Sequence, residues 1–380
     1  MTPIKVLIVD DSALVRKMLK EMLSTDPMIT VVGTAIDPYD AREKIKQLHP
    51  DVLTLDVEMP KMDGVTFLKN LMRLHPVPVV MVSTLTEKGA DVTFEAMDLG
   101  AVDFVTKPKI DLAHTFEDYT YEICNKVKTA SRVSRSMLER QYARYVSNQS
   151  QKPATASYSV NHKVDHTVDS LSARFSATSS LQSNQQVSQS TRKSTKLVAL
   201  GASTGGTEAI KEVLIRLPAN APAIVITQHI PAAFSLPFAN RMDSVSQMTV
   251  HHAEDGMEIH PGHVYIAPGD KHLVIAKSGT RLICRLDDSE PVNRHKPAVD
   301  VMFRSVLQVA GSKAIGVLLT GMGADGAAGL KELKLSGVPT IAQDQKTSVV
   351  WGMPGEAVKI GAVDSVLPLE KIASKIMELA

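Results

Sequence analysis

The chain has little cysteine, almost no net charge and no long apolar run. Cys124 and Cys284 are the only cysteines in 380 residues and lie far apart, which indicates reduced thiols rather than a disulfide framework or a cysteine metal site. A formal net charge of +1 argues against nucleic acid or anionic lipid as a partner. The sequence also lacks a signal-peptide pattern and a run able to span a bilayer, so we expect a cytoplasmic protein without membrane insertion.

The length and composition favour a soluble protein of two domains. Hydrophobic residues make up 44% and charged residues 22%, as in ordinary globular proteins. A chain of 380 residues exceeds the usual size of one compact core. Changes in pattern along the chain place a first domain at residues 1–124, a helix end with a flexible linker at 125–193, and a second domain at 194–380.

The first domain alternates short apolar runs with stretches of helical period. Ser12 is placed to cap the first helix, and Asp37 with Pro38 to begin the second. Uninterrupted apolar strands with helices between them predict a doubly wound parallel sheet, a (βα)5 unit with both faces covered. The five expected strands are Lys5–Val9, Ile29–Thr34, Val52–Leu55, Val79–Val82 and Ala101–Val105.

The middle and the second domain differ in character. From about Ser147 to Ser194 the chain is rich in Ser, Gln, Thr and Asn, which is typical of a flexible tether; its basic residues lack the clustering and interleaved aromatics of a nucleic-acid patch. After Lys196 the α/β rhythm returns, interrupted between Thr249 and Arg285 by turns that suggest β-hairpins. We therefore expect a second doubly wound α/β domain with an antiparallel hairpin insertion.

Three carboxylates end strands of the first domain. Asp10 and Asp11 follow the first strand and Asp56 the third, and in an open α/β sheet the carboxyl ends of the strands are where ligands bind. Close carboxylates repel one another unless a hard cation lies among them, so Mg²⁺ is the expected ligand. Ser83 and Lys107, at two further strand ends, add a hydroxyl and a positive charge that suit a phosphoryl group. A single aspartate at such a position is more often only a helix cap.

This set resembles the receiver domains of two-component response regulators, from the Asp10-Asp11 pair through the Phe104-Val105-Thr106-Lys107-Pro108 stretch. The resemblance implies that Asp56 accepts phosphate from a histidine kinase. It implies Mg²⁺ on Asp11 and Asp56, with Asp10 acting through the water shell. It also implies that Ser83 and Lys107 contact the phosphoryl oxygens and that Phe104 changes position in response.

The second domain opens with a serine in a glycine-flanked turn. Leu197 to Ala202 reads as a strand, and Ser203 follows within Gly201-Ala202-Ser203-Thr204-Gly205-Gly206, before a predicted helix. Such a turn presents a nucleophile beside backbone N–H groups that can receive an oxyanion. A phosphate-cradling loop is the alternative, but the dinucleotide fingerprint is incomplete and the next strand ends in His229 where a ribose-binding acid is wanted.

The base and its orienting acid are chosen by position. His229 ends the strand expected beside the serine strand, and Asp325 closes the apolar run Ala314–Leu319. Alone, each residue is more often structural, as a hydrogen-bonded histidine or a helix cap. The α/β-hydrolase order of serine, acid and histidine does not fit, because no histidine follows Asp325. Spacing alone does not choose among the histidines after the serine, which are His229, His251, His252, His260, His263, His272 and His295.

The order Ser203, His229, Asp325 resembles the catalytic domain of the chemotaxis protein-glutamate methylesterases, which also act as protein-glutamine glutaminases. Matching stretches are 201–206, 228–229, 261–268 and 321–326. Ile230, where methionine is common in the family, and the long tether depart from the pattern.

The resemblance implies a serine hydrolase, without a cofactor for the ester chemistry, that demethylates glutamyl methyl esters and deamidates glutamines on methyl-accepting chemoreceptors. The backbone N–H of Met322 would receive the oxyanion and Thr204 would line the pocket. The unphosphorylated receiver would cover the esterase site. The rival functions are a regulator that binds DNA or protein without catalysis, for which no helix-turn-helix with a basic face is evident, and a general esterase or lipase.

Overall fold

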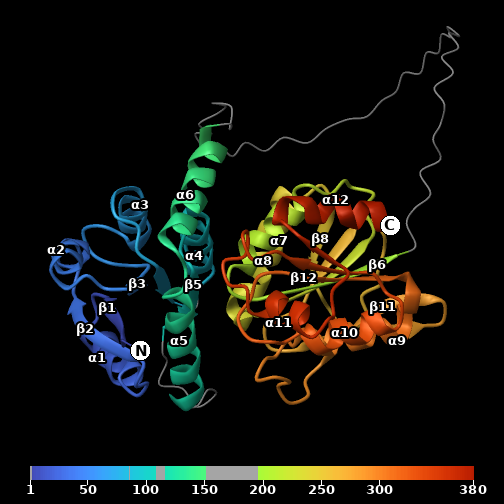
Figure 1. Ribbon diagram of the computed structural model, residues 1–380, viewed down its shortest axis with the longest axis horizontal. Coiled ribbons are helices and arrows are strands. Elements are labelled where there is room, and N and C mark those ends of the chain that lie inside the picture. Colours follow the sequence, from blue (N-terminus) through green and yellow to red (C-terminus); the bar gives the residue numbers. More distant parts are fainter. Residues whose placement is uncertain (1, 85, 108–115, 151–195) are drawn as a thin grey trace, which may run out of the picture.

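The computed structural model describes residues 2–84, 86–107, 116–150 and 196–380, which form two α/β domains lying side by side (Figure 1). The first domain is on the blue side of the ribbon and the second on the yellow-to-red side. The helices α4 (Glu87–Leu99), α5 (Phe116–Ala130) and α6 (Arg135–Ser150) stand between the first sheet and the second domain.

The N-terminal domain is the doubly wound (βα)5 unit expected from the sequence. Its parallel sheet has the strand order β2-β1-β3-β4-β5, and the residues of β3 and β4 are all buried, because helices cover both faces of the sheet. Ser12 caps α1 and Asp37 caps α2 with side-chain hydrogen bonds, as predicted. The strands are β1 (Ile4–Val9), β2 (Ile29–Ala35), β3 (Val52–Asp56), β4 (Val79–Ser83) and β5 (Asp103–Thr106), and the first three helices are α1 (Ala13–Leu23), α2 (Pro38–Leu48) and α3 (Gly64–Leu74).

The segment at 125–193 contains more helix than the sequence indicated. Helix α5 ends at Ala130, and α6 follows at Arg135–Ser150, where only a helix end and linker were expected. The polar composition of α6 hides its helical period, but Leu138 is fully buried and the helix packs on α3 and α4. Tertiary packing therefore stabilises a helix that its own sequence signals weakly. The rest of the expected linker, from residue 151 on, lies outside the described residues.

The C-terminal domain is built on a seven-stranded sheet with the order β14-β13-β12-β6-β7-β9-β8, and all of its strand pairs are parallel. Its strands are β6 (Leu197–Ala202), β7 (Ala223–Gln228), β8 (Thr249–His252), β9 (His263–Ile266), β12 (Ala314–Leu318), β13 (Thr340–Gln343) and β14 (Ser365–Leu367). Its helices are α7 (Gly206–Leu214), α8 (Ala232–Val245), α9 (Val299–Ala310), α10 (Ala327–Leu335), α11 (Met353–Lys359) and α12 (Leu369–Leu379), with a short 3₁₀ turn at Gly311–Lys313.

The predicted hairpin insertion is present but smaller than expected. The strands β10 (His272–Ser278) and β11 (Arg281–Asp287) form an antiparallel pair whose turn contains Gly279 at φ 62°. The prediction of hairpins over the whole of Thr249–Arg285 was wrong, because β8 and β9 pair in parallel at the sheet edge. The Pro261-Gly262 turn lies in the crossover connection between β8 and β9. A turn signal in the sequence does not show whether the two strands that flank it pair with each other in antiparallel fashion.

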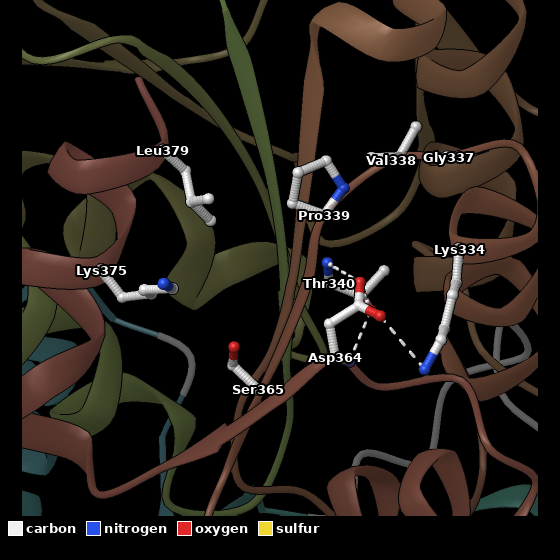
Figure 2. Close-up of a pocket in the computed structure, with 9 residues that line it drawn as sticks. All are labelled: Lys334, Gly337, Val338, Pro339, Thr340, Asp364, Ser365, Lys375 and Leu379. Carbon is white, nitrogen blue, oxygen red and sulfur yellow. Dashed lines mark hydrogen bonds and ion pairs between the residues drawn. The ribbon is translucent and has the colours of Figure 1, made fainter.

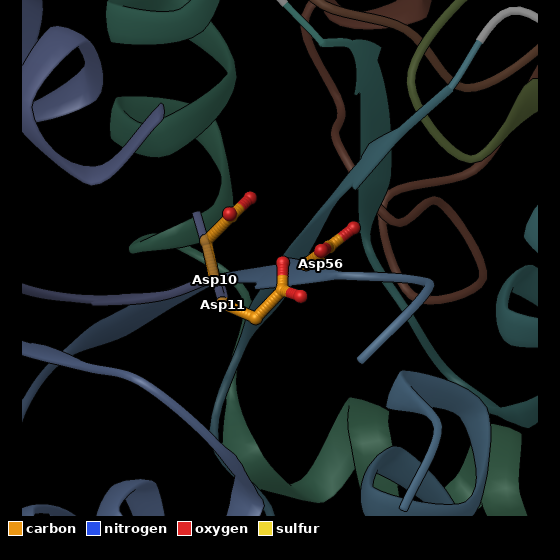
Figure 3. Close-up of side chains that lie close together, drawn as sticks. All are labelled: Asp10, Asp11 and Asp56. Carbon is orange, nitrogen blue, oxygen red and sulfur yellow. The ribbon is translucent and has the colours of Figure 1, made fainter. Parts of the chain in front are cut away.

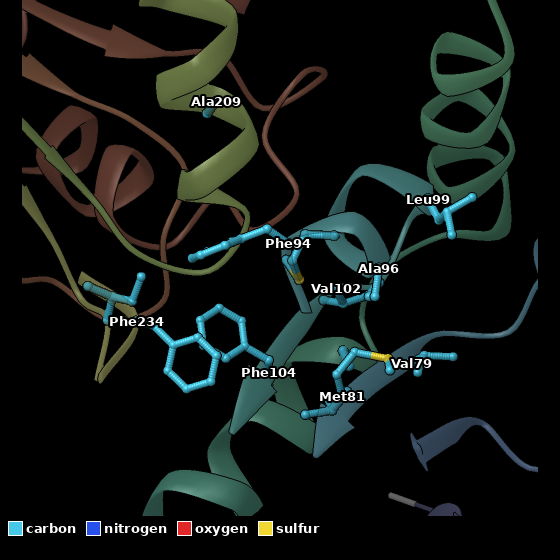
Figure 4. Packing of buried hydrophobic residues seen from close by; sticks show 14 of the residues in the cluster. Val79, Met81, Phe94, Ala96, Leu99, Val102, Phe104, Ala209 and Phe234 are labelled. Carbon is cyan, nitrogen blue, oxygen red and sulfur yellow. The ribbon is translucent and has the colours of Figure 1, made fainter. Parts of the chain in front are cut away.

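The two domains meet through an aromatic cluster. Phe94 of α4 and Phe104 of β5 contact Phe234 of α8, with the Phe104 and Phe234 ring centroids 4.7 Å apart (Figure 4). Asp98 of α4 adds ion pairs to Lys211 of α7 and Arg241 of α8. The contact surface of the first domain therefore consists of the elements next to its predicted phosphoryl site.

Candidate functional site

The three predicted carboxylates of the first domain converge at one edge of its sheet. Asp10 and Asp11 directly follow β1, and Asp56 is the last residue of the neighbouring strand β3 (Figure 3). One ligand oxygen from each carboxylate lies within 4.8 Å of the others. Asp10 and Asp56 are buried, whereas Asp11 is exposed.

The electrostatics of this cluster fit a hard cation. Burial raises the pKa of Asp56 to about 6, with the charge of Asp10 adding to the effect and the Lys107 ammonium opposing it. The Lys107 Nζ lies 2.7 Å from Asp56 Oδ2 and 3.5 Å from Asp10 Oδ2. Asp10 Oδ2 is buried and accepts no hydrogen bond from the described residues. The cluster thus has spare oxygen ligands and a surplus of negative charge.

The remaining predicted residues of the first domain lie on the adjoining strands. Ser83 ends β4 and pairs with Thr106 of β5, so β4 lies between the Asp56 strand and the Phe104 strand. The Ser83 hydroxyl accepts a hydrogen bond of 2.8 Å from the buried Thr93 of α4. Phe104 is buried at the domain contact.

Ser203 lies in a tight turn between β6 and α7. Its backbone N–H donates to Thr320 O at 3.0 Å, and its carbonyl accepts from Gly206 N at 2.6 Å. Gly205 has φ 74° and lies so close to Val349 that a Cβ would come within 2.6 Å of it. The turn therefore needs glycine, as the sequence indicated, and it leaves Ser203 partly exposed.

His229 and Asp325 form a hydrogen-bonded pair, His229 Nε2 to Asp325 Oδ2, at 2.9 Å. The exposed fractions of their side chains are only 9% and 1%. The Asp325 carboxylate also accepts from the backbone N–H groups of Val299 and Asp300 at the start of α9, from Gly326 N and from Asn293 Nδ2.

Burial alone would raise the pKa of Asp325. The hydrogen bond and charge of His229, the Asn293 amide and the Val299 N–H outweigh burial and lower that pKa below its ordinary value. A permanently ionised carboxylate thus accepts the Nε2 proton of His229 and fixes the tautomer of the ring.

The other ring nitrogen of His229, Nδ1, is buried and makes no hydrogen bond to any residue that the structure describes. Ser203 and His229 directly follow Ala202 and Gln228, which are paired in register on β6 and β7. No hydrogen bond joins Ser203 Oγ to His229 among the described residues, but this register puts the two residues at the same end of neighbouring strands.

His295 is a member of the site that spacing did not single out. Its ring stacks on His229 with centroids 3.7 Å apart and planes 12° apart. Burial, with the neighbouring charge of His229, lowers the pKa of His295 to about 3, so its imidazole is neutral. Asn293, from the same loop, holds Asp325 and was also missed. The segment Asn293-Arg294-His295 contains no sequence motif that would predict the contact of Asn293 with Asp325 or of His295 with His229.

The other histidines after Ser203 have partners elsewhere. His251 Nε2 lies 2.9 Å from His263 Nδ1, and His252 Nε2 lies 3.0 Å from the hydroxyl of Ser235. His272 accepts from Ala298 N, and the exposed His260 lies near Glu258. These contacts leave His229 as the histidine bonded to the buried Asp325.

The two predicted pocket residues are covered by the first domain. The Thr204 hydroxyl donates to Asp103 of β5, and Thr129 of α5 donates to the Met322 sulfur. The loop that carries Asn293 and His295 also reaches the first domain, since the Arg294 guanidinium lies 4.6 Å from the ring centre of Tyr121. The access of a substrate to Ser203 therefore depends on the position of the first domain relative to the second.

A separate cavity of about 480 Å³ lies at the opposite edge of the second sheet, where β13 and β14 begin (Figure 2). Lys334 and Asp364 face each other there and form an ion pair of 3.1 Å. None of the predicted catalytic residues lines this cavity.

The two halves of the chain match two protein families. Residues 6–116 match the response regulator receiver domain, and residues 198–376 match the CheB methylesterase domain. The protein-glutamate methylesterase/protein-glutamine glutaminase of Hydrogenovibrio crunogenus is 69% identical over 379 residues, covering 100% of this chain and 99% of the relative.

This chain belongs to the protein-glutamate methylesterase/protein-glutamine glutaminase family.

The chain is also similar to a second relative and to a solved structure. A family member of Xanthomonas campestris pv. campestris is 52% identical, covering 100% of this chain and 98% of its own length. The crystal structure of the CheB methylesterase catalytic domain of Thermotoga maritima is 44% identical, with a TM-score of 0.48, and covers 49% of this chain and 98% of that chain. The match of residues 198–376 to a methylesterase family favours an enzyme over the alternative of an output domain that binds DNA or protein without catalysis. Within the described residues, no helix is long and apolar enough to cross a membrane.

Protons and cations should compete at the carboxylates of the receiver domain. Because the pKa of Asp56 is raised to about 6, this carboxylate is ionised at pH 7.5 and largely protonated at pH 5. We expect millimolar Mg²⁺ to raise the thermal unfolding midpoint at pH 7.5 and to have much less effect at pH 5, measured by circular dichroism. Asp56→Asn should reduce the effect at pH 7.5, whereas Asp51→Asn, at the other end of β3, should retain it. Equal stabilisation at both pH values would contradict this account.

Removing the ring that stacks on His229 should impair hydrolysis. We expect His295→Ala to lower kcat/KM for a glutamyl methyl ester by about tenfold to a hundredfold, since the imidazole of His229 loses its support on one face. His295→Phe keeps an aromatic face and should retain most of the activity. His260→Ala is the matched control on the exposed surface and should be unaffected. The stacking role is rejected if the alanine and phenylalanine variants are equally active.

Proposed function

We propose that this chain is a phosphorylation-activated hydrolase that acts in the cytoplasm on methyl-accepting chemoreceptors. It demethylates glutamyl methyl esters and deamidates specific glutamines, giving sensory adaptation in chemotaxis. Residues 1–124 are its receiver domain and 194–380 its catalytic domain. The observation that carries the proposal is the buried His229–Asp325 pair at the sheet edge that also presents Ser203.

The chemistry is acyl transfer to a serine. His229 Nδ1 takes the proton of the Ser203 hydroxyl while Asp325 holds Nε2–H, and the serine oxygen attacks the γ-carbonyl carbon of the substrate. The backbone N–H groups at the start of α7 and of Met322 receive the oxyanion. The imidazolium returns its proton to the leaving group, which is methanol from an ester or ammonia from a glutamine. Water then attacks the acyl-enzyme with His229 again as base, which releases glutamate and restores Ser203.

Asp56 is the phosphoryl acceptor in this proposal. Its carboxylate attacks the phosphorus atom of a histidine kinase's phosphohistidine, the phosphorus–nitrogen bond breaks and the imidazole of the kinase leaves, with Lys107 beside the transferred oxygens. Asp10, Asp11 and Asp56 would hold Mg²⁺, which when bound offsets the negative charge that gathers there.

Phosphorylation then relieves a block on the esterase site. The receiver domain contacts Thr204 and Met322 in the structure, and Phe104 lies in the domain contact one strand from Ser83. A new charge near −2 on Asp56 attracts Lys107 and the Ser83 hydroxyl. Movement of β4 and β5 toward that charge loosens the surface formed by Phe94, Phe104 and Phe234.

Ser203→Ala should abolish turnover of methylated chemoreceptors. Loss of the nucleophile is expected to lower methanol release by at least about a thousandfold, measured with the phosphorylated full chain. Ser244→Ala, an exposed serine on α8, should retain full activity. Substantial methanol release by the Ser203 variant would reject Ser203 as the nucleophile.

Activation should depend on Asp56. We expect phosphoramidate with Mg²⁺ to raise methanol release by the full chain about tenfold or more, because the covered pocket becomes accessible. Asp56→Asn should stay at the basal rate, and Asp51→Asn should respond like the natural chain. If the unphosphorylated chain is already as fast as the phosphorylated one, inhibition by the receiver domain is excluded.

A further inference from the structure

Asp103 of the receiver domain reaches the pocket of the catalytic domain with its carboxylate. Asp103 Oδ2 accepts the hydrogen bond of the Thr204 hydroxyl, next in sequence to Ser203. Asp103 Oδ1 accepts from Phe104 N at 2.8 Å and lies 3.2 Å from Lys126 Nζ. The exposed fractions of Asp103 and Thr204 are only 7% and 5%. A charged group of the receiver domain is thus buried against the residue that follows the proposed nucleophile, with one oxygen held by each domain.

We propose that the Thr204 hydroxyl forms a carboxylate-binding subsite, which binds the γ-carboxylate of the product glutamate and which Asp103 occupies in this structure as an internal product mimic. This inference rests on the proposed function, because hydrolysis of the acyl-enzyme leaves a carboxylate beside Ser203. Aspartate and glutamate side chains end in the same CH₂–COO⁻ group. A hydroxyl that donates a hydrogen bond to the carboxylate of Asp103 can therefore donate one to the γ-carboxylate of glutamate.

The subsite is preorganised for an anionic acceptor. The carbonyl of Thr204 accepts from the buried Thr320 hydroxyl at 3.0 Å, which fixes the backbone from which the Thr204 hydroxyl projects. A hydrogen bond to an ionised carboxylate is about twice as strong as one between neutral groups. If Asp103 is removed, the buried hydroxyl lacks its acceptor, and a free carboxylate restores it.

The position of Asp103 links this contact to phosphorylation. Asp103 begins β5 and directly precedes Phe104, whose backbone N–H holds its carboxylate. Phe104 packs on Phe234 across the domain contact (Figure 4). A shift of β5 therefore moves the aromatic contact and the carboxylate together. As part of the same chain, Asp103 competes with a product or substrate at an effective concentration that the linker between the domains sets.

The test measures inhibition of methanol release by sodium acetate at constant ionic strength, with the unphosphorylated full chain. We expect Asp103→Ala to raise the basal rate several-fold and to become competitively inhibited by millimolar acetate. The natural chain should be several-fold less sensitive to acetate, because Asp103 already fills the subsite. Asp103→Ala combined with Thr204→Val should lose the acetate inhibition, and the combination with Thr204→Ser, which keeps the hydroxyl, should retain it.

A matched control separates the subsite from simple loosening of the domain contact. Asp98→Ala removes the ion pairs to Lys211 and Arg241 but leaves Asp103 in place. Acetate should inhibit the Asp98→Ala chain less strongly than the Asp103→Ala chain, when the two variants have comparable basal rates of methanol release. Equal acetate inhibition of the Asp103→Ala chain with and without Thr204→Val would overturn the proposal.

The subsite is also tested without turnover. In a Ser203→Ala background, line broadening of acetate in NMR spectra should increase on Asp103→Ala and fall again on Thr204→Val. If the natural chain with phosphoramidate releases no methanol, the proposed function fails, whereas an unchanged acetate signal across these variants rejects the subsite alone.

Discussion

Both sites depend on one constraint, the direction of parallel strands. When neighbouring strands run the same way, the residues that follow them gather at one edge of the sheet. Asp10, Asp56 and Lys107 come together at this edge in the receiver domain, and Ser203 and His229 in the catalytic domain. The helices on both faces bury the strands, so the edge is where polar groups can approach a ligand. The chemistry of each domain is thus a consequence of its sheet topology.

The same residue type serves two opposite electrostatic roles in the two domains. Asp325 is buried among five hydrogen-bond donors, so its pKa is lowered and its charge is permanent. Asp56 is buried beside Asp10 with one ammonium to compensate, so its pKa is raised to about 6. A stable charge suits a residue that orients a histidine. A carboxylate under repulsion suits a site that binds a cation and accepts a phosphoryl group.

The contact between the two domains joins the elements next to the acidic cluster to residues near the predicted triad. Phe94 and Phe104 of the receiver domain meet Phe234 of the catalytic domain, and Asp103 and Thr129 contact the predicted pocket residues Thr204 and Met322. Every one of these receiver residues comes from α4, β5 or α5, the elements next to Ser83 and Lys107. A change at the acidic cluster therefore has only one strand or helix to cross before it reaches the predicted pocket residues.

The sequence by itself determined the two α/β domains, the carboxylate cluster and the order of the predicted triad, because apolar period and the residue that follows each strand are local properties. It did not reveal α6, whose weak helical pattern is stabilised by packing, nor that β8 and β9 pair in parallel, because a turn signal does not choose a strand's partner. Only the tertiary structure decided that Asp325 bonds His229 through Nε2, that His295 stacks on that ring, and that Asp103 faces Thr204. These contacts join segments up to about a hundred residues apart, and their geometry follows from how whole elements pack rather than from any local pattern.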